Sequence, residues 1–171
     1  NKKNTPAALP ALIEPKNIAL MEEFGVLTKV EMESRYEVEM EHYSKIINIE
    51  ALTMLEMARK QLLPAINAYM SEVATAASKL AVSEHISVRS ETKTLEKLSS
   101  DADTMSDAID TLQDAVNAAK ALPTESEKAV AFHDNVLPVM DALRAAADDA
   151  ETICGEDYWP LPSYSKMLYY V

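Results

Sequence analysis

Glycine is almost absent from this chain, and its scarcity limits the folds that the chain can adopt. The 171 residues contain only Gly25 and Gly155, so residues 26–154 lack the residue that most readily forms tight turns. Sheets depend on such turns, and a dinucleotide-binding fold needs a Gly-rich phosphate loop. Ala, Leu, Met, Glu and Lys dominate the same interval and favour helix. We therefore predict an all-α protein.

Three stretches repeat apolar residues at spacings of three and four, which is the pattern of helices with one buried face. Their apolar positions are Leu52, Leu55, Leu62, Ile66, Tyr69, Val73, Ala76 and Leu80; Val88, Leu95, Leu98, Ala102, Met105, Ile109, Leu112, Val116 and Ala119; and Ala129, Phe132, Val136, Val139, Leu143, Ala146, Ala150 and Ile153. The links at 83–87 and 122–126 are short, and short links join antiparallel neighbours. The sequence predicts an antiparallel bundle of three long helices.

The first long helix is predicted to begin well before the bundle and to be kinked. Thr28 and Glu31 match a capping box, and helical sequence continues from there to about residue 81. Pro64 removes a backbone donor and clashes with the preceding turn, so we expect two segments, about 28–62 and 64–82, either separate or joined as one bent rod. Pro138 predicts a second kink in the last helix.

The two ends of the chain differ from the bundle in composition. Pro6 and Pro10 predict an extended lead-in over 1–14, and a short helix over 15–24 follows, ended by Gly25. The tail is rich in proline and aromatic residues and is predicted to be extended; these residues are Pro160, Pro162, Tyr158, Trp159, Tyr164, Tyr169 and Tyr170.

We predict a single domain over 1–171. It comprises the lead-in at 1–14, a short helix and helix extension at 15–49, the three-helix bundle at 50–154 and the tail at 155–171. The extension carries apolar residues that the bundle does not use: Val30, Tyr36, Val38, Met40, Tyr43, Ile46 and Ile47. We expect the tail and the short helix to pack there, or this surface to meet another domain.

The charge of the chain excludes several classes of partner. The formal net charge is −12, and no cluster of Lys and Arg is visible, so neither nucleic acid nor an anionic membrane is an expected partner. No apolar run approaches the length of a membrane span. Cys154 is the only cysteine, which suits a cytoplasmic location. The polar start NKKNTP lacks an initiator Met, so we expect a piece of a longer protein.

Two groups of residues have spacings that could bind a metal. Glu39 and His42 form a Glu-x-x-His pair, as in di-iron bundles, but neither His85 nor His133 supplies the second pair that such a site needs. A second group, Asp103, Asp107, Asp110 and Asp114, lies on one side of a helix, without the glycine of a calcium loop. We interpret both groups as solvated polar faces.

Cys154 is the one candidate nucleophile, and its position argues against that role. It lies at the predicted C-terminus of a helix, where the helix dipole raises the pKa of a thiol. We interpret it as a packing residue, and no catalytic, cofactor-binding or metal-binding residue is predicted.

Several segments resemble the C-terminal region of type III glutamine synthetases. They are ESRYE at 33–37, INIEAL at 47–52 and LLPA at 62–65, within a similar run over 9–66, and DYWPLPSY at 157–164. The resemblance frames the whole chain, with a looser middle at about 70–150.

The resemblance implies an accessory structural domain of an ATP-dependent glutamate–ammonia ligase of nitrogen assimilation. In that family, ATP and Mg bind in domains upstream of this region, so this chain is expected to hold no cofactor and to be inactive alone. The implied partners are the parent catalytic domain and neighbouring subunits of a homo-oligomeric ring. The alternatives are a regulatory domain for a nitrogen-signalling protein or metabolite, and a metal-binding helical bundle.

Overall fold

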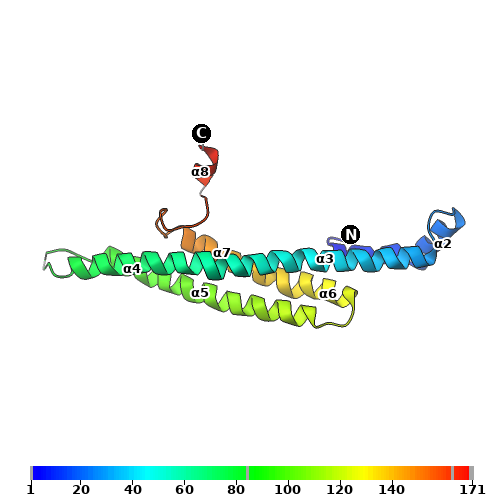
Figure 1. Cartoon of the computed structure of the whole chain (residues 1–171), viewed down its shortest axis with the longest axis horizontal. Helices are drawn as coiled ribbons and strands as arrows, with labels where there is room; N and C mark the ends of the chain where they lie inside the picture. The colour runs from blue at the N-terminus through cyan, green and yellow to red at the C-terminus, as the bar shows by residue number, and fades with distance from the viewer. Residues whose placement is uncertain (1, 84, 163, 170–171) are drawn as a thin grey trace. The chain divides into compact units, whose positions relative to one another are not determined.

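The described part of the chain is helical and contains no strand. The computed structural model describes residues 2–83, 85–162 and 164–169. Its elements are α1 (Thr5–Ala8), the 3-10 helix η1 (Leu9–Ile13), α2 (Pro15–Glu23), α3 (Lys29–Met57), the π-helical turn η2 (Ala58–Leu62), α4 (Leu63–Leu80), α5 (Arg89–Lys120), α6 (Glu125–Ala131), the π-helical turn η3 (Phe132–Val136), α7 (Leu137–Glu151) and α8 (Tyr164–Leu168) (Figure 1). The predicted all-α architecture with long helices is confirmed.

The chain divides into two compact units. Unit 1 consists of Asn1–Leu52 and Leu112–Met140, and unit 2 consists of Thr53–Thr111 and Asp141–Val171. The border between Leu52 and Thr53 lies close to the predicted start of the bundle at residue 50. However, unit 1 also contains 112–140, which the sequence interpretation gave to the bundle. The single domain over 1–171 stays a prediction.

Unit 1 buries side chains from three helical segments against one another. Its fully buried core comes from α3, the end of α5, η3 and the residues beside it: Met32, Met40, Leu112, Val116, Phe132 and Val136. The short link from α5 to α6 turns the chain back (Figure 1). At the start of α6, Thr124 and Glu127 form a capping box. This second capping box was not predicted, although it has the same Thr-x-x-Glu spacing as the first.

Unit 2 contains α4, most of α5 and the later part of α7. Its buried core includes Ile66, Leu98, Met105 and Leu143. Lys97 on α5 pairs with Asp101 on the same helix and with Asp149 on α7. These hydrogen bonds raise the pKa of Lys97, with Asp101 as the larger cause. The ion pair therefore joins two helices of the unit at their surface.

The turn between α2 and α3 has the predicted signals at both of its sides. Gly25 has a φ of 65°, and the Val26 N–H donates to the Met21 carbonyl at 2.9 Å, which is a Schellman ending for α2. At the start of α3, the Thr28 N–H donates to Glu31 Oε2 at 2.7 Å and the Glu31 N–H donates to Thr28 Oγ1 at 3.3 Å. The capping box at Thr28 is confirmed.

Both interior prolines follow a π-helical turn, and the chain stays helical through them. The Leu63 N–H donates to the Ala58 carbonyl, and the Leu137 N–H donates to the Phe132 carbonyl, five residues back in each case. Proline cannot donate a hydrogen bond and its ring crowds the carbonyl one turn earlier. The extra residue of a π turn relieves that crowding, so the expected interruptions take this form.

The predicted extended ends are wrong in part. The lead-in is helical because the Asn4 side chain caps α1, accepting from the Ala7 N–H at 2.8 Å, and because Pro6 and Pro10 occupy first-turn positions where the missing N–H costs nothing. In the tail, 164–168 form α8, since this stretch has no proline and contains the helix formers Lys, Met and Leu. The predictions for Glu84, Ser163 and Tyr170 lie outside the described residues.

Several apolar residues were assigned to the wrong side of their helix. Leu52 is 41% exposed, whereas the neighbouring Ala51 is buried. Met40 and Ile47, expected to be surplus, are buried in the core of unit 1. The alternation of three and four near residue 50 fits either neighbouring position, and the small Ala51 carries little hydrophobic signal.

Candidate interaction surface

Unit 1 exposes a set of large apolar side chains around the turn between α2 and α3. We call Leu20, Phe24, Val26 and Val30 the α2–α3 apolar segment; their exposed fractions are 48%, 72%, 62% and 74%. The segment is ordered by the Schellman ending at Gly25 and by Glu22, whose Oε1 accepts from the Lys29 N–H at 3.0 Å. The backbone thus presents these side chains to solvent from a well-bonded turn.

A second exposed apolar set continues along α3. Val38, Ile49 and Leu52 are 56%, 63% and 41% exposed. At 100° per residue they lie within about 60° of one another around the helix. Together with the α2–α3 apolar segment, this α3 stripe is the candidate surface. Gathered exposed apolar groups mark interaction sites. Complete burial of a fully exposed side chain of this kind is worth about 1.5–3 kcal/mol, and these partly exposed side chains would contribute less each.

The C-terminal tail packs on α4 within unit 2 and then exposes its last described apolar residues. The Tyr158 hydroxyl donates a hydrogen bond to the Glu72 carboxylate. The centroid of the Tyr158 ring lies 5.3 Å from the centroid of the Tyr69 ring. The hydrogen bond to Glu72 raises the pKa of Tyr158. The tail was expected to pack against 15–49, whereas at Tyr158 it contacts α4 instead. Beyond it, Leu168 and Tyr169 are 75% and 81% exposed.

The candidate metal residues lie on the exposed surface. The Nδ1 of His42 is 4.0 Å from a carboxylate oxygen of Glu39, and both side chains are more than half exposed. The four aspartates at 103, 107, 110 and 114 are all exposed. Within the described ranges, no group of three or more His, Cys, Asp or Glu side chains is arranged to hold a metal ion.

Cys154 is buried, and burial raises the pKa of its thiol. The direction agrees with the sequence argument, but the cause is desolvation rather than the helix dipole. A protonated, shielded thiol is a poor nucleophile. No helix of the described residues combines the length and apolar character needed to cross a membrane.

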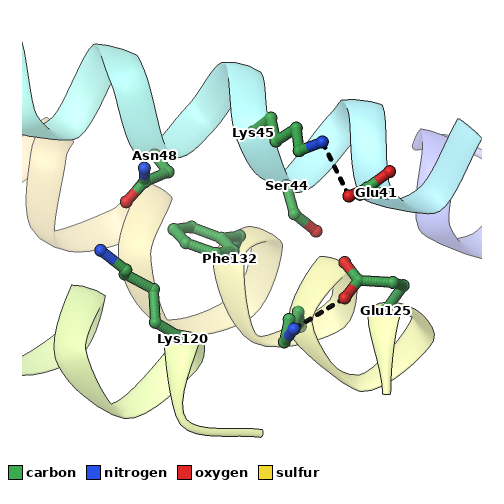
Figure 2. A pocket seen from close by; sticks show the side chains of 8 residues that line it. Glu41, Ser44, Lys45, Asn48, Lys120, Glu125 and Phe132 are labelled. Carbon is green, nitrogen blue, oxygen red and sulfur yellow. Dashed lines mark hydrogen bonds and ion pairs between the residues drawn. The ribbon is translucent and has the colours of Figure 1, made fainter. Parts of the chain in front are cut away.

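Unit 1 also contains a cavity of about 210 Å³ between α3, α5, α6 and η3 (Figure 2). Phe132 and Ser44 are its buried lining residues, and charged and amide side chains surround them. Sequence reasoning missed this cavity, because its residues come from four elements and share no local spacing. Phe132 was predicted only as a core residue.

Comparison with known proteins finds a family similar to the first part of the chain. A family model described as "Glutamine synthetase C-terminal domain" matches residues 1–81. Residues 1–81 are thus similar to the glutamine synthetase C-terminal domain family. The resemblance read from ESRYE, INIEAL and LLPA is thereby confirmed, and the candidate surface, from Leu20 to Leu52, lies within the matched part.

Three curated relatives extend the similarity beyond the glutamine synthetase C-terminal domain match. A glutamine synthetase of Butyrivibrio fibrisolvens is 34% identical over 99% of this chain. A type-3 glutamine synthetase of Dictyostelium discoideum is 29% identical over 99%, and a glutamine synthetase of Bacteroides fragilis is 22% identical over 97%. The chain spans 24% of the length of each relative.

Proposed function

We propose that this chain is the accessory C-terminal domain of a glutamine synthetase and has no active site of its own. In this proposal the parent enzyme is a cytoplasmic ligase of nitrogen assimilation that joins glutamate and ammonia with ATP and Mg. The chain packs on the catalytic part of that polypeptide and on neighbouring subunits of a ring. The observation that carries the proposal is the exposed apolar surface of unit 1, which lies inside the part matched by the family model.

The size of the relatives supports a partner for this surface. The chain covers 24% of the Butyrivibrio enzyme, so about three quarters of such a polypeptide is available to cover the apolar residues. Burial of Phe24 and Val30, which are 72% and 74% exposed in this chain, would add hydrophobic stabilisation to the assembled enzyme.

The test is a matched pair of substitutions in the full-length enzyme. Val30→Asp places a charge within the candidate surface, and Ser71→Asp places the same charge at an exposed position of α4, outside that surface. We expect Val30→Asp to lower the assembled fraction, measured by mass photometry, and the rate of glutamine formation. Ser71→Asp should leave both unchanged, because Ser71 lies outside the candidate surface.

Two further measurements separate assembly from folding and from catalysis. The circular dichroism of the 171-residue chain should be the same with either substitution, because both positions are exposed. The chain alone should form no measurable glutamine. An enzyme that keeps normal assembly and activity after Val30→Asp, and after removal of the whole chain, would rule out the assembly role.

A further inference from the structure

The lining of the cavity in unit 1 has an unusual charge for this protein. Lys45, Lys120 and Lys128 face Glu41 and Glu125, so the lining carries three positive and two negative formal charges, a net +1. The whole chain carries −12. A local excess of positive charge on an acidic protein favours the carboxylate of a ligand over a cation.

Four of these five charges are already paired within the protein. Lys45 Nζ lies 2.7 Å from a Glu41 oxygen, and Lys128 Nζ lies 2.6 Å from a Glu125 oxygen. Lys120 forms no ion pair with any residue that the structure describes. Its ammonium group is therefore the cation of the cavity that is available to an anion.

Asn48 adds an unsatisfied acceptor to the same cavity. Its Oδ1 is buried and has no hydrogen-bond partner among the described residues. A buried polar atom without a partner costs free energy, and a ligand that donates to it recovers that cost. A ligand reaches this oxygen after rotation about the terminal torsion of Asn48, which is soft.

The arrangement of the lining orients a ligand. Figure 2 shows the Phe132 ring between Asn48 and Lys120 on one side and Glu41, Lys45 and Glu125 on the other. One side thus offers an acceptor and a cation, and the ring offers an apolar wall. The volume of about 210 Å³ is below the 300–1,000 Å³ of drug-sized sites, so only a small molecule fits.

We propose that this cavity binds a small α-amino acid. Its carboxylate accepts from the Lys120 ammonium, its ammonium donates to Asn48 Oδ1, and its side chain lies against Phe132. These two head groups are adjacent in every α-amino acid, which matches one free cation and one free acceptor. A simple carboxylate would leave Asn48 unsatisfied, and a simple amine would meet Lys120 with a like charge.

A second cavity of unit 1 has no lysine or arginine in its lining. It measures about 380 Å³, and its polar lining residues are Ser126, Glu127, Asp134 and Asn135. The first three bond to other side chains of unit 1, and Asn135 is exposed and uncharged. It therefore offers a ligand less than the cavity beside Phe132 does.

The experiment is a calorimetric titration of the 171-residue chain with glycine, L-alanine, L-serine and L-glutamine, each compared with propionate and ethylamine. We expect at least one amino acid to bind saturably, and propionate and ethylamine to bind about tenfold or more weakly, as loss of one charge-assisted hydrogen bond implies. Propionate binding as well as alanine would overturn the amino-acid assignment. No saturable binding at tens of millimolar would overturn the site.

Two variants and a control locate the site. Lys120→Met and Asn48→Ala should each weaken amino-acid binding about tenfold or more. Lys93→Met removes an exposed lysine from the same helix, outside the cavity, and should leave binding within about twofold. Equal binding by all three variants would place the ligand elsewhere. Circular dichroism checks the fold of each variant, and none of these outcomes depends on the assembly role proposed above.

Discussion

The left-handed backbone of Gly25 offers a sharp test of how the α2–α3 turn is held. Its φ is 65°, and a Cβ built on it would have no heavy atom within 4 Å. The cost of Gly25→Ala is therefore a backbone cost alone. A left-handed conformation costs an L-residue about 1–2 kcal/mol, and the loss of chain freedom in the unfolded state offsets part of it. We expect a net loss of about 1 kcal/mol in the stability of the turn.

Amide hydrogen exchange measures this loss locally. The Val26 N–H, bonded to the Met21 carbonyl at 2.9 Å, opens when the turn unfolds. A loss of about 1 kcal/mol accelerates its exchange about fivefold. The Met32 N–H, bonded to the Thr28 carbonyl at 3.0 Å on the α3 side, should exchange at an unchanged rate.

A second substitution at Gly25 separates backbone strain from other causes. Asparagine adopts the left-handed region far more readily than alanine does, so Gly25→Asn should accelerate exchange less than Gly25→Ala. If Val26 exchanges at the wild-type rate in Gly25→Ala, or equally fast in both variants, the left-handed residue does not control the turn and the reasoning fails.

Three further predictions concern the core, a cap and the buried thiol. Leu112→Ala, at a fully buried position, should lower the free energy of unfolding by about 3 kcal/mol in urea titrations. Leu20→Ala, at a 48% exposed position, should change it by about 0.5 kcal/mol or less. Similar losses in the two variants would contradict the assigned core. Thr124→Ala should lower the free energy of unfolding by about 1 kcal/mol, because the capping box is lost. Thr111→Ala, on the exposed side of α5, should leave the free energy of unfolding unchanged. Equal effects of the two substitutions would refute the cap. Burial raises the pKa of the Cys154 thiol in the folded protein, so the thiol of the unfolded chain ionises first as the pH rises above about 8.5. Above that pH the free energy of unfolding of the wild type should fall more than that of Cys154→Ala. Parallel curves of stability against pH for the two proteins would count against this.

The helices were predictable because local signals define them. Thr28 with Glu31 and Gly25 after α2 satisfy backbone groups within a few residues, so their spacing in the sequence is sufficient. The lead-in was missed because Pro6 and Pro10 are compatible with both an extended chain and a first helical turn. The prolines alone do not decide between these two states, and the Asn4 side chain, which caps α1, favours the helical one.

The candidate surface and the cavity depend on contacts between distant residues, which periodicity does not report. Val38 was recognised as surplus to the bundle, but Met40 was not recognised as core, because core and surface positions lie two residues apart on the same helix. The cavity required Asn48, Lys120 and Phe132 to meet from three elements. Their separation along the chain hides that relation from any local pattern.

The two π-helical turns also explain why apolar residues around the prolines remain in phase. Ala58, Leu62 and Ile66 are buried at steps of four and four, and so are Phe132, Val136 and Met140. On an ideal α-helix an eight-residue step rotates a side chain about 80° away from its starting direction. Each π turn absorbs the surplus residue, so that all three side chains keep facing the core. When the chain is aligned with its relatives, a one-residue gap therefore belongs at these turns. Deletion of one residue at a π turn returns the helix to ordinary α-helical register. Deletion of one residue elsewhere in the bundle would rotate every later core residue of that helix away from the core.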